Sequence, residues 1–136
     1  MSLEVFLNFD GNCRDALDFY VKVFNLQMPD QIMTYDQNPQ GNFGEENKGR
    51  ILYATLPICG SNVMFSDCPA GSHFVKGTNI ALTIGTTDES EITRIYNALA
   101  EDGMVLMPLG KTFFSELYGM VTDKLGITWQ ISKSQI

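Results

Sequence analysis

A repeated strand-turn-helix pattern is the feature that most constrains how this chain can fold. The stretch "VFLNFDGNCRDALDFYVKVF" (residues 5–24) matches "IALTIGTTDESEITRIYNAL" (residues 80–99) at one offset of 75 residues. In both stretches apolar residues first alternate, as in a strand with one buried face, and then recur every three or four positions, as on a helix. Chance similarity between two generic strand-helix pairs is the alternative. Because one offset aligns both elements, we predict two copies of a single β-α unit.

The residues that begin each helix support this interpretation. Asn12 is placed to cap the first helix, and Asp15 adds negative charge to its first turn. Asp88 and Glu91 have the spacing of a capping box at the start of the second helix. We therefore expect both helices to begin where the alternating pattern ends.

Similar strand patterns follow both helices. "RILYATLPICGSNVMFSD" contains two strand-like runs around Gly60-Ser61-Asn62, and "YGMVTDKLGITWQIS" contains two around residues 123–126. Additional strands are expected at residues 31–35 and 104–109. Each half therefore has the order β-α-β-β-β.

We predict a single α+β domain over residues 1–136, with one repeat over about 1–67 and the other over about 79–136. The expected architecture is a curved mixed sheet that forms a cup, with the helices on its outer face. Long polar loops are predicted at residues 36–49 and 68–78.

Strand alternation also indicates which residues point away from the helices. If Leu7, Phe9 and Ile84 pack under the helices, their neighbours in sequence lie on the opposite face. Apolar and hydrogen-bonding side chains mixed in this way are typical of ligand pockets, although a solvated face or one closed by a dimer partner is the alternative. The residues assigned to this face are Phe6, Asn8, Tyr53, Thr55, Met64, Ser66, Asn79, Thr83, Thr128 and Gln130. Trp129, by contrast, has the alternation of the core.

Composition excludes several classes of function. With 16 acidic and 9 basic side chains, a formal charge of −7 and no run of Lys or Arg, the chain is a poor match for nucleic acid or an anionic membrane surface. No apolar run reaches the ~18 residues of a membrane span. Three cysteines without a C-x-x-C pair indicate a reducing, cytoplasmic setting, in which we expect all three to be buried.

The whole chain resembles the PhnB-type branch of the vicinal oxygen chelate superfamily, which includes glyoxalase I, extradiol dioxygenases and the bleomycin and fosfomycin resistance proteins. The resemblance rests on "FLNFDGNCRDALDFYVKVF", "GSNVMFSD", "GTNIALTI", "MPLGKTFF" and "YGMVTDKLGITWQI", in that order. Some members of the branch carry the label 3-demethylubiquinone-9 3-methyltransferase. The resemblance implies a bacterial homodimer with a glyoxalase-like fold that binds a small molecule.

The superfamily usually holds a divalent metal at four inward strand positions, and the resemblance maps these positions onto Glu4, Met64, Asn79 and Gln130. Only Glu4 is an ordinary metal ligand, and thioether and amide groups are poor ligands for such ions. The single histidine, His73, lies in a predicted loop. We therefore disfavour a metal and expect no cofactor, with Glu4 as the one weak metal candidate.

The segment "PLGKTFFSELYG" supplies further candidates. Lys111 is suited to an anionic ligand group and Phe113 to covering a ligand, although a solvated lysine and a packed phenylalanine are equally consistent. No residue is assigned a catalytic role. The leading hypothesis is metal-independent small-molecule binding. A metal-dependent lyase, isomerase or dioxygenase that uses Glu4, with water or with His73, is the alternative. The methyltransferase label has least support, because the first β-α turn, "NFDGNCRD", is not a glycine-rich cofactor loop.

Overall fold

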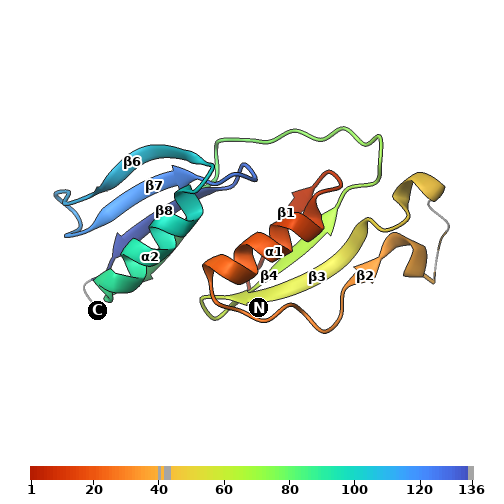
Figure 1. Ribbon diagram of the computed structural model, residues 1–136, viewed down its shortest axis with the longest axis horizontal. Helices are drawn as coiled ribbons and strands as arrows, with labels where there is room; N and C mark the ends of the chain where they lie inside the picture. The colour runs from red at the N-terminus through yellow and green to blue at the C-terminus, as the bar shows by residue number, and fades with distance from the viewer. Residues whose placement is uncertain (40, 42–43, 135–136) are drawn as a thin grey trace. The chain divides into compact units, whose positions relative to one another are not determined.

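The computed structural model of the chain describes residues 1–39, 41 and 44–134. The chain divides into two compact units, an N-terminal unit of residues Met1–Val75 and a C-terminal unit of residues Lys76–Ile136. Each unit has the element order β-α-β-β-β (Figure 1). The predicted fold class, α+β with two β-α-β-β-β copies, is therefore confirmed.

The N-terminal unit consists of one α-helix on a four-stranded sheet, within the residues described. Its elements are β1 (Val5–Phe9), α1 (Cys13–Val23), β2 (Met33–Thr34), β3 (Ile51–Ile58) and β4 (Ser61–Asp67), with 3-10 turns at Tyr35–Gln37 and Glu45–Asn47. The strand order is β1-β4-β3-β2, in which β1 and β4 run parallel and the other neighbours antiparallel. The predicted strand at residues 31–35 is shorter than expected, and residues 40, 42 and 43 of the predicted 36–49 loop lie outside the described residues.

The C-terminal unit repeats this arrangement. Its elements are β5 (Leu82–Thr86), α2 (Glu89–Ala100), β6 (Met104–Gly110), β7 (Tyr118–Thr122) and β8 (Thr128–Lys133). The strand order is β5-β8-β7-β6, with β5 and β8 parallel. The strand predicted at residues 104–109 is therefore confirmed.

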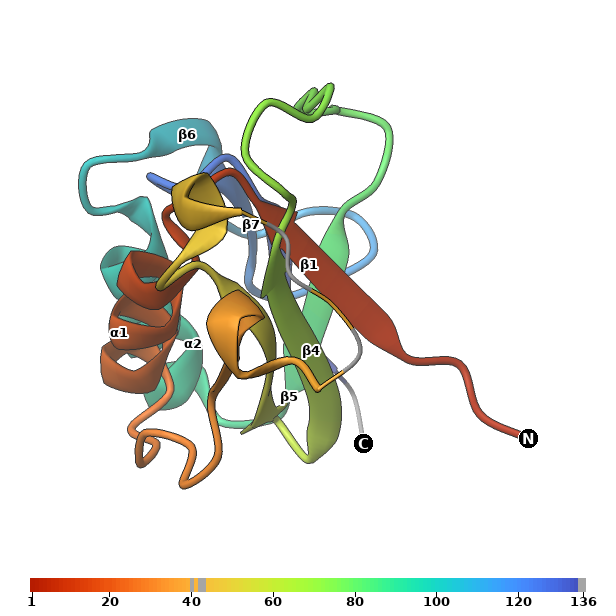
Figure 2. The same cartoon turned by 90° about the vertical axis from the view of Figure 1, so that its right-hand side faces the viewer.

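Each helix packs on one face of its own sheet, which we call the helix face. In the N-terminal unit, Tyr20 of α1 contacts Phe65, with ring centroids 5.8 Å apart, and Phe65 stacks on Phe9. Figures 1 and 2 show α1 lying along one side of this sheet. In the C-terminal unit, Trp129 and Ile131 are buried as predicted. The opposite side of each sheet, which no helix of its own unit covers, is its open face.

A buried carboxylate fixes the start of α1. Asn12 occupies the cap position, but its side chain makes no capping hydrogen bond, so its predicted role is wrong. Asp67, at the end of β4, instead accepts hydrogen bonds through Oδ1 from the backbone N–H groups of Gly11 and Cys13, and through Oδ2 from that of Ile51. A buried carboxylate with three donors stabilises the helix start and two strands together.

The start of α2 agrees with the sequence prediction, whereas the first hairpin turn lies slightly earlier than predicted. Asp88 accepts hydrogen bonds from the N–H groups of Ser90 and Glu91, as expected for a cap. The side chain of Glu91 pairs with Arg94. In the first hairpin the turn lies at Cys59 and Gly60, both with positive φ, rather than at Gly60-Ser61-Asn62. Two positive φ values are typical of the two-residue turns that match the twist of the strands.

We predict that Asp67→Asn lowers the free energy of unfolding by about 2 kcal/mol, because an amide cannot accept all three backbone hydrogen bonds without placing its NH₂ group against a donor. Urea denaturation followed by circular dichroism measures the change. Asp18→Asn, at an exposed position of α1, is the control and is expected to change stability by less than about 0.5 kcal/mol. Equal stability of the two variants would contradict the role given to Asp67.

Candidate functional site

The open face of the N-terminal sheet carries all six residues that the alternation pattern assigned to it. Phe6 of β1 lies opposite Met64 of β4, which lies opposite Thr55 of β3. Asn8 lies opposite Ser66. Their neighbours along the strands, including Leu7, Ala54 and Phe65, are buried on the helix face. The sequence therefore predicts the facing of these side chains correctly, whereas a role in binding remains a prediction.

Two aromatic rings form the centre of this face. Phe6 and Tyr53 are 44% and 45% exposed, and their rings meet edge to face with centroids 6.5 Å apart. The Thr55 hydroxyl donates a hydrogen bond to the Tyr53 hydroxyl at 3.0 Å. This contact fixes the position of the phenol while leaving its ring in solvent. The pair thus offers an apolar surface with an oriented polar group.

Met33 extends the apolar surface and was not among the predicted site residues. It lies on β2 opposite Tyr53 and is 43% exposed. The sequence contained a usable signal, because Met33 lies within the predicted strand at residues 31–35. The register with β3, which depends on an irregularity between Met33 and Thr34, could not be obtained from the sequence.

Ser66 differs from the other residues of this face. It is buried, and its hydroxyl donates a hydrogen bond to the Asp67 carbonyl oxygen at 3.0 Å. The hydroxyl of buried Tyr35 donates to the same oxygen at 2.8 Å, and burial raises the pKa of Tyr35. Ser66 therefore supports the end of β4, and Asn8 is the more accessible polar group on the face.

The open face of the C-terminal sheet is polar on one side and apolar on the other. Thr83 of β5 lies opposite Gln130 of β8, so these two residues share a face, as predicted. Gln130 in turn lies opposite Met120 of β7, which pairs with Met107 of β6. Thr128, also assigned to this face, is buried and lies 3.0 Å from the Thr122 hydroxyl. The two methionines were not predicted, because the alternation analysis did not extend to β6 and β7.

Asn79 does not occupy the strand position expected for it. The strand β5 begins at Leu82, so Asn79 is exposed in the segment that precedes the sheet. Ile80, which the 75-residue offset aligns with Val5 of β1, is 75% exposed for the same reason. The repeat therefore aligns the sequence correctly but extends this strand too far.

Lys111 and Phe113 lie in the connection between β6 and β7, and both are exposed. Thr112 closes a tight turn, because its N–H donates to the Ser115 carbonyl oxygen and its Oγ1 accepts from the Ser115 N–H. Phe113 is fully exposed at this turn, and Phe114 packs edge to face on Tyr118 with ring centroids 4.9 Å apart. The turn thus presents one phenylalanine to solvent and holds the next against the sheet.

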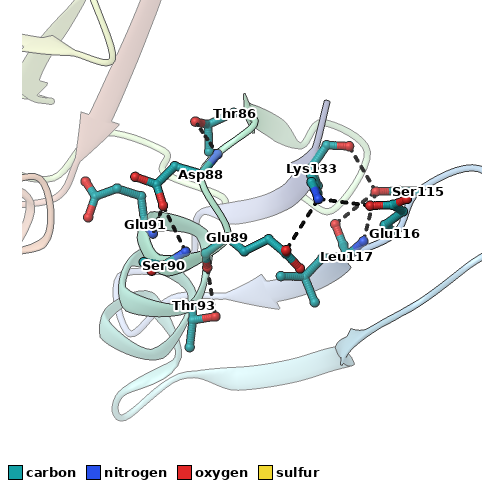
Figure 3. Close-up of polar contacts among 10 residues, drawn as sticks. All are labelled: Thr86, Asp88, Glu89, Ser90, Glu91, Thr93, Ser115, Glu116, Leu117 and Lys133. Carbon is teal, nitrogen blue, oxygen red and sulfur yellow. Dashed lines mark hydrogen bonds and ion pairs between the residues drawn. The ribbon is translucent and has the colours of Figure 1, made fainter. Parts of the chain in front are cut away.

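A polar cluster anchors this connection to the sheet and to α2 (Figure 3). Lys133 Nζ lies 2.9 Å from Glu116 and 3.3 Å from Glu89, and these contacts raise the pKa of Lys133. The Ser115 hydroxyl also donates to the carbonyl oxygens of Leu117 and Lys133. The β6–β7 connection is therefore held where it enters β7, through Ser115 and Glu116, and Lys133 links it to α2 through Glu89.

The side chains at the four positions where the superfamily usually holds a metal do not suit a divalent ion. Glu4 and Asn79 are exposed and precede β1 and β5, while Met64 and Gln130 supply a thioether and an amide. Within the described part of the chain, no group of three or more His, Cys, Asp and Glu side chains is placed to hold a metal. His73 is exposed in the 68–78 segment. Hard and borderline divalent ions prefer carboxylate and imidazole ligands, so the residues present are a poor fit.

Trp129 is confirmed as a core residue. Its Nε1 donates a hydrogen bond to Asp123 Oδ2 at 2.9 Å, and Asp123 Oδ1 accepts from the N–H groups of Leu125 and Ile127. This buried aspartate organises the β7–β8 turn predicted at residues 123–126. Trp129 consequently reports on the packing of the C-terminal unit.

The chain belongs by sequence to a described family. The family model for 3-demethylubiquinone-9 3-methyltransferase matches residues 2–132. This chain is a member of that family. The expected resemblance to PhnB proteins is confirmed, because a PhnB protein is 30% identical over nearly the whole chain. The methyltransferase label is the family's name and carries no assignment of activity to this chain.

Individual relatives agree with the family assignment. Protein YjdN of Escherichia coli strain K12 is 29% identical over 141 residues, which cover 97% of this chain and 95% of that protein. The PhnB protein from Bacillus cereus is 30% identical with a TM-score of 0.81, covering 98% of this chain and all of that one. Protein PA1353 from Pseudomonas aeruginosa is 28% identical with a TM-score of 0.85, covering 99% and 100%. The fosfomycin resistance protein FosX from Mesorhizobium loti, at 7% identity and a TM-score of 0.63, shares the fold alone.

The cysteines differ in their surroundings, contrary to the expectation that all three are buried. Cys13 is buried and Cys59 is exposed. Cys68 is partly buried, with its sulfur 3.6 Å from the Asp10 carboxylate, which also pairs with Arg50. Burial raises the pKa of Cys13, and burial together with Asp10 raises that of Cys68.

We predict that one thiol of the native protein reacts rapidly with a disulfide reagent at about pH 8, because the thiolate is the reactive form and Cys59 alone is exposed at a turn. Counting the thiols released over time by absorbance tests this. Cys59→Ser removes the rapid phase, whereas Cys68→Ser leaves it. A rapid phase that persists in Cys59→Ser would contradict this ranking.

Proposed function

We propose that this chain binds a small, partly apolar molecule on the open face of its N-terminal sheet without using a metal ion. The observation that carries the proposal is the exposed pair of Phe6 and Tyr53, whose phenol is oriented by Thr55. Exposing two adjacent aromatic rings to water is unfavourable, so a ligand that covers them gains apolar contact area.

The chemistry of this face indicates the kind of ligand. Met33 and Met64 flank the aromatic pair with flexible thioether side chains that adapt to different shapes. Asn8 supplies an amide on β1 and Tyr53 a hydroxyl on β3. A planar apolar molecule with one or two hydrogen-bonding groups fits this combination best.

The remaining predicted residues of the described strands and turns include a second group, in the C-terminal unit. Thr83 and Gln130 supply polar groups on the C-terminal open face, and Lys111 and Phe113 lie in the anchored β6–β7 connection. We propose that these residues also serve ligand binding, with Lys111 favouring an anionic group. The contribution of these residues to ligand affinity has to be measured separately from that of Phe6 and Tyr53, because each unit has its own open face.

The alternative is a metal-dependent lyase, isomerase or dioxygenase. It would use Glu4, with water or with His73, as its ligands. The four inward strand positions, with one carboxylate, one thioether and two amides, are a poor ligand set for the divalent ion that would serve as the electrophile in such reactions. Methyl transfer has least support, because the β1–α1 turn is not a glycine-rich cofactor loop and the sheet is not doubly wound.

We further propose that the protein acts in the cytoplasm as a homodimer and does not bind nucleic acid or membranes. The net charge of −7 supports the absence of nucleic-acid and membrane binding. The resemblance to the PhnB-type branch supports the homodimer, and the absence of a C-x-x-C pair supports the cytoplasm. No helix in the described residues has the length and apolar character required to cross a bilayer.

We predict that Phe6→Ala and Tyr53→Ala each weaken binding of the fluorescent probe 8-anilinonaphthalene-1-sulfonate about tenfold, corresponding to ~1.4 kcal/mol. The loss is expected because each change removes one of the two aromatic rings at the centre of this face. Fluorescence titration in the presence and absence of a chelator gives the affinity. Val75→Ala, at an apolar position that is also exposed, is the matched control and should bind the probe normally.

Circular dichroism spectra must match for all variants, since both aromatic side chains are half exposed and their removal should leave the fold intact. Unchanged affinity in both aromatic variants would rule out this face as the site. Loss of binding on adding chelator alone would instead favour the metal-dependent alternative.

A further inference from the structure

The polar groups on the open face of the N-terminal sheet differ in what they leave for a ligand. The polar side chains assigned to this face are Asn8, Tyr53, Thr55 and Ser66. Ser66 uses its hydroxyl proton within the chain, because it donates to the Asp67 carbonyl oxygen. Thr55 donates its proton to the Tyr53 oxygen at 3.0 Å. Two of these three hydroxyl groups therefore have no proton to offer a bound molecule.

The alternation of β3 brings Tyr53 and Thr55 together. The two residues are separated by one position, so their side chains leave the same face of the strand. Ala54, between them, is buried on the helix face. The hydrogen bond lies within one strand and hence within one unit. The orientation of the phenol is thus a local property of the β3 sequence.

The direction of this hydrogen bond determines which way the phenol proton points. A phenol has one proton to donate, and when its oxygen accepts a hydrogen bond that proton points elsewhere. Among the residues that the structure describes, none accepts the proton of Tyr53. Tyr53 therefore meets a ligand as a hydrogen-bond donor, while Thr55 occupies its capacity as an acceptor.

The other groups of this face do not discriminate in this way. The amide of Asn8 donates through its NH₂ group and accepts through its oxygen, so it suits either kind of partner. Phe6, Met33 and Met64 contribute apolar surface, which has no preference between donors and acceptors. Selection by the type of hydrogen bond therefore depends on Tyr53 and Thr55.

We propose that Tyr53 and Thr55 make this face selective for molecules whose ring system carries a hydrogen-bond acceptor, such as an aromatic ketone. Equally shaped molecules with a donor or with no polar group bind less tightly. Tyr53 donates its proton to the acceptor, and Thr55 is a positioning residue that acts through Tyr53. The inference rests on the proposed function, because it concerns the ligand of the same face. A ligand that covers the phenol without accepting its proton leaves a desolvated donor without a partner, which is unfavourable.

Three bicyclic probes of similar shape test this selectivity. They are 1-indanone, which carries an acceptor, indole, which carries a donor, and indane, which carries neither. Displacement of 8-anilinonaphthalene-1-sulfonate from the full chain gives the affinity of each probe. We expect 1-indanone to bind about three- to tenfold more tightly than indane, which is the effect of one neutral hydrogen bond. Indole is expected to bind no more tightly than indane.

Substitutions separate donation by Tyr53 from its positioning by Thr55. Tyr53→Phe keeps the ring but removes the hydroxyl, and should make the affinities for 1-indanone and indane equal. Thr55→Val frees the Tyr53 oxygen to accept, and is expected to raise the affinity for indole relative to indane about twofold or more. Thr55→Ser keeps the donating hydroxyl and should preserve the wild-type order. A merely structural role of Thr55 would instead change all three affinities in parallel.

The control for these variants is Thr93→Val, which makes the same change at an exposed threonine of α2 and leaves all three affinities unchanged. A preference for 1-indanone that persists in Tyr53→Phe would overturn the proposal, because another group would then supply the donor. Failure of all three probes to displace the dye at their solubility limits would also overturn it.

The variant Phe6→Ala distinguishes failure of this inference from failure of the proposed function. Probes that bind, lose affinity in Phe6→Ala and yet show no preference for 1-indanone would overturn the selectivity and leave the binding face intact. Probe affinities that Phe6→Ala does not change would rule out the face and the selectivity together.

Discussion

The N-terminal open face depends on the Asp67 carboxylate. The Asp67 carboxylate joins the β1–α1 turn to the start of β3 by accepting three backbone hydrogen bonds. Its backbone carbonyl oxygen accepts hydrogen bonds from the hydroxyls of Tyr35 and Ser66. These contacts hold β4 between β1 and β3. The position of β4 in turn sets Met64 between Phe6 and Thr55. The position of the exposed pair, Phe6 and Tyr53, thus depends on the buried hydrogen bonds of Asp67 at the end of β4.

The two copies of the repeat use different electrostatics at the same position. Asp67 pairs with Phe9 across β1 and β4, and Lys133 pairs with Thr86 across β5 and β8. The aspartate is buried and caps a helix, whereas the lysine joins the start of α2 to the β6–β7 connection (Figure 3). In the N-terminal repeat this position, Asp67, stabilises the start of α1. In the C-terminal repeat the equivalent position, Lys133, holds the β6–β7 connection, which carries Phe113. We infer that the two open faces have different binding properties.

The sequence predicted the fold well because its signals were periodic and occurred twice. Alternation placed Phe6, Tyr53 and Gln130 on the open faces without knowledge of the strand order. It failed where a residue's partner is distant in sequence. Asn12 has the chemistry of a cap, but its side chain makes no capping hydrogen bond, and the N–H groups on either side of it, those of Gly11 and Cys13, donate to the distant Asp67 carboxylate. Asn79 continues the repeat pattern, yet the strand begins three residues later at Leu82. Met33, Met107 and Met120 were missed because their facing depends on register.

The central claim is that the site works without a metal, and native-condition intact mass spectrometry of protein purified without chelator or affinity metal tests it most directly. We predict a mass equal to that of the polypeptide, as monomer or dimer, with or without an organic adduct. Because the donor groups on the described open faces are thioethers, amides and hydroxyls, no divalent ion should be retained in stoichiometric amount. A stoichiometric divalent metal in the native mass would contradict the account and make metal-assisted catalysis the function to test.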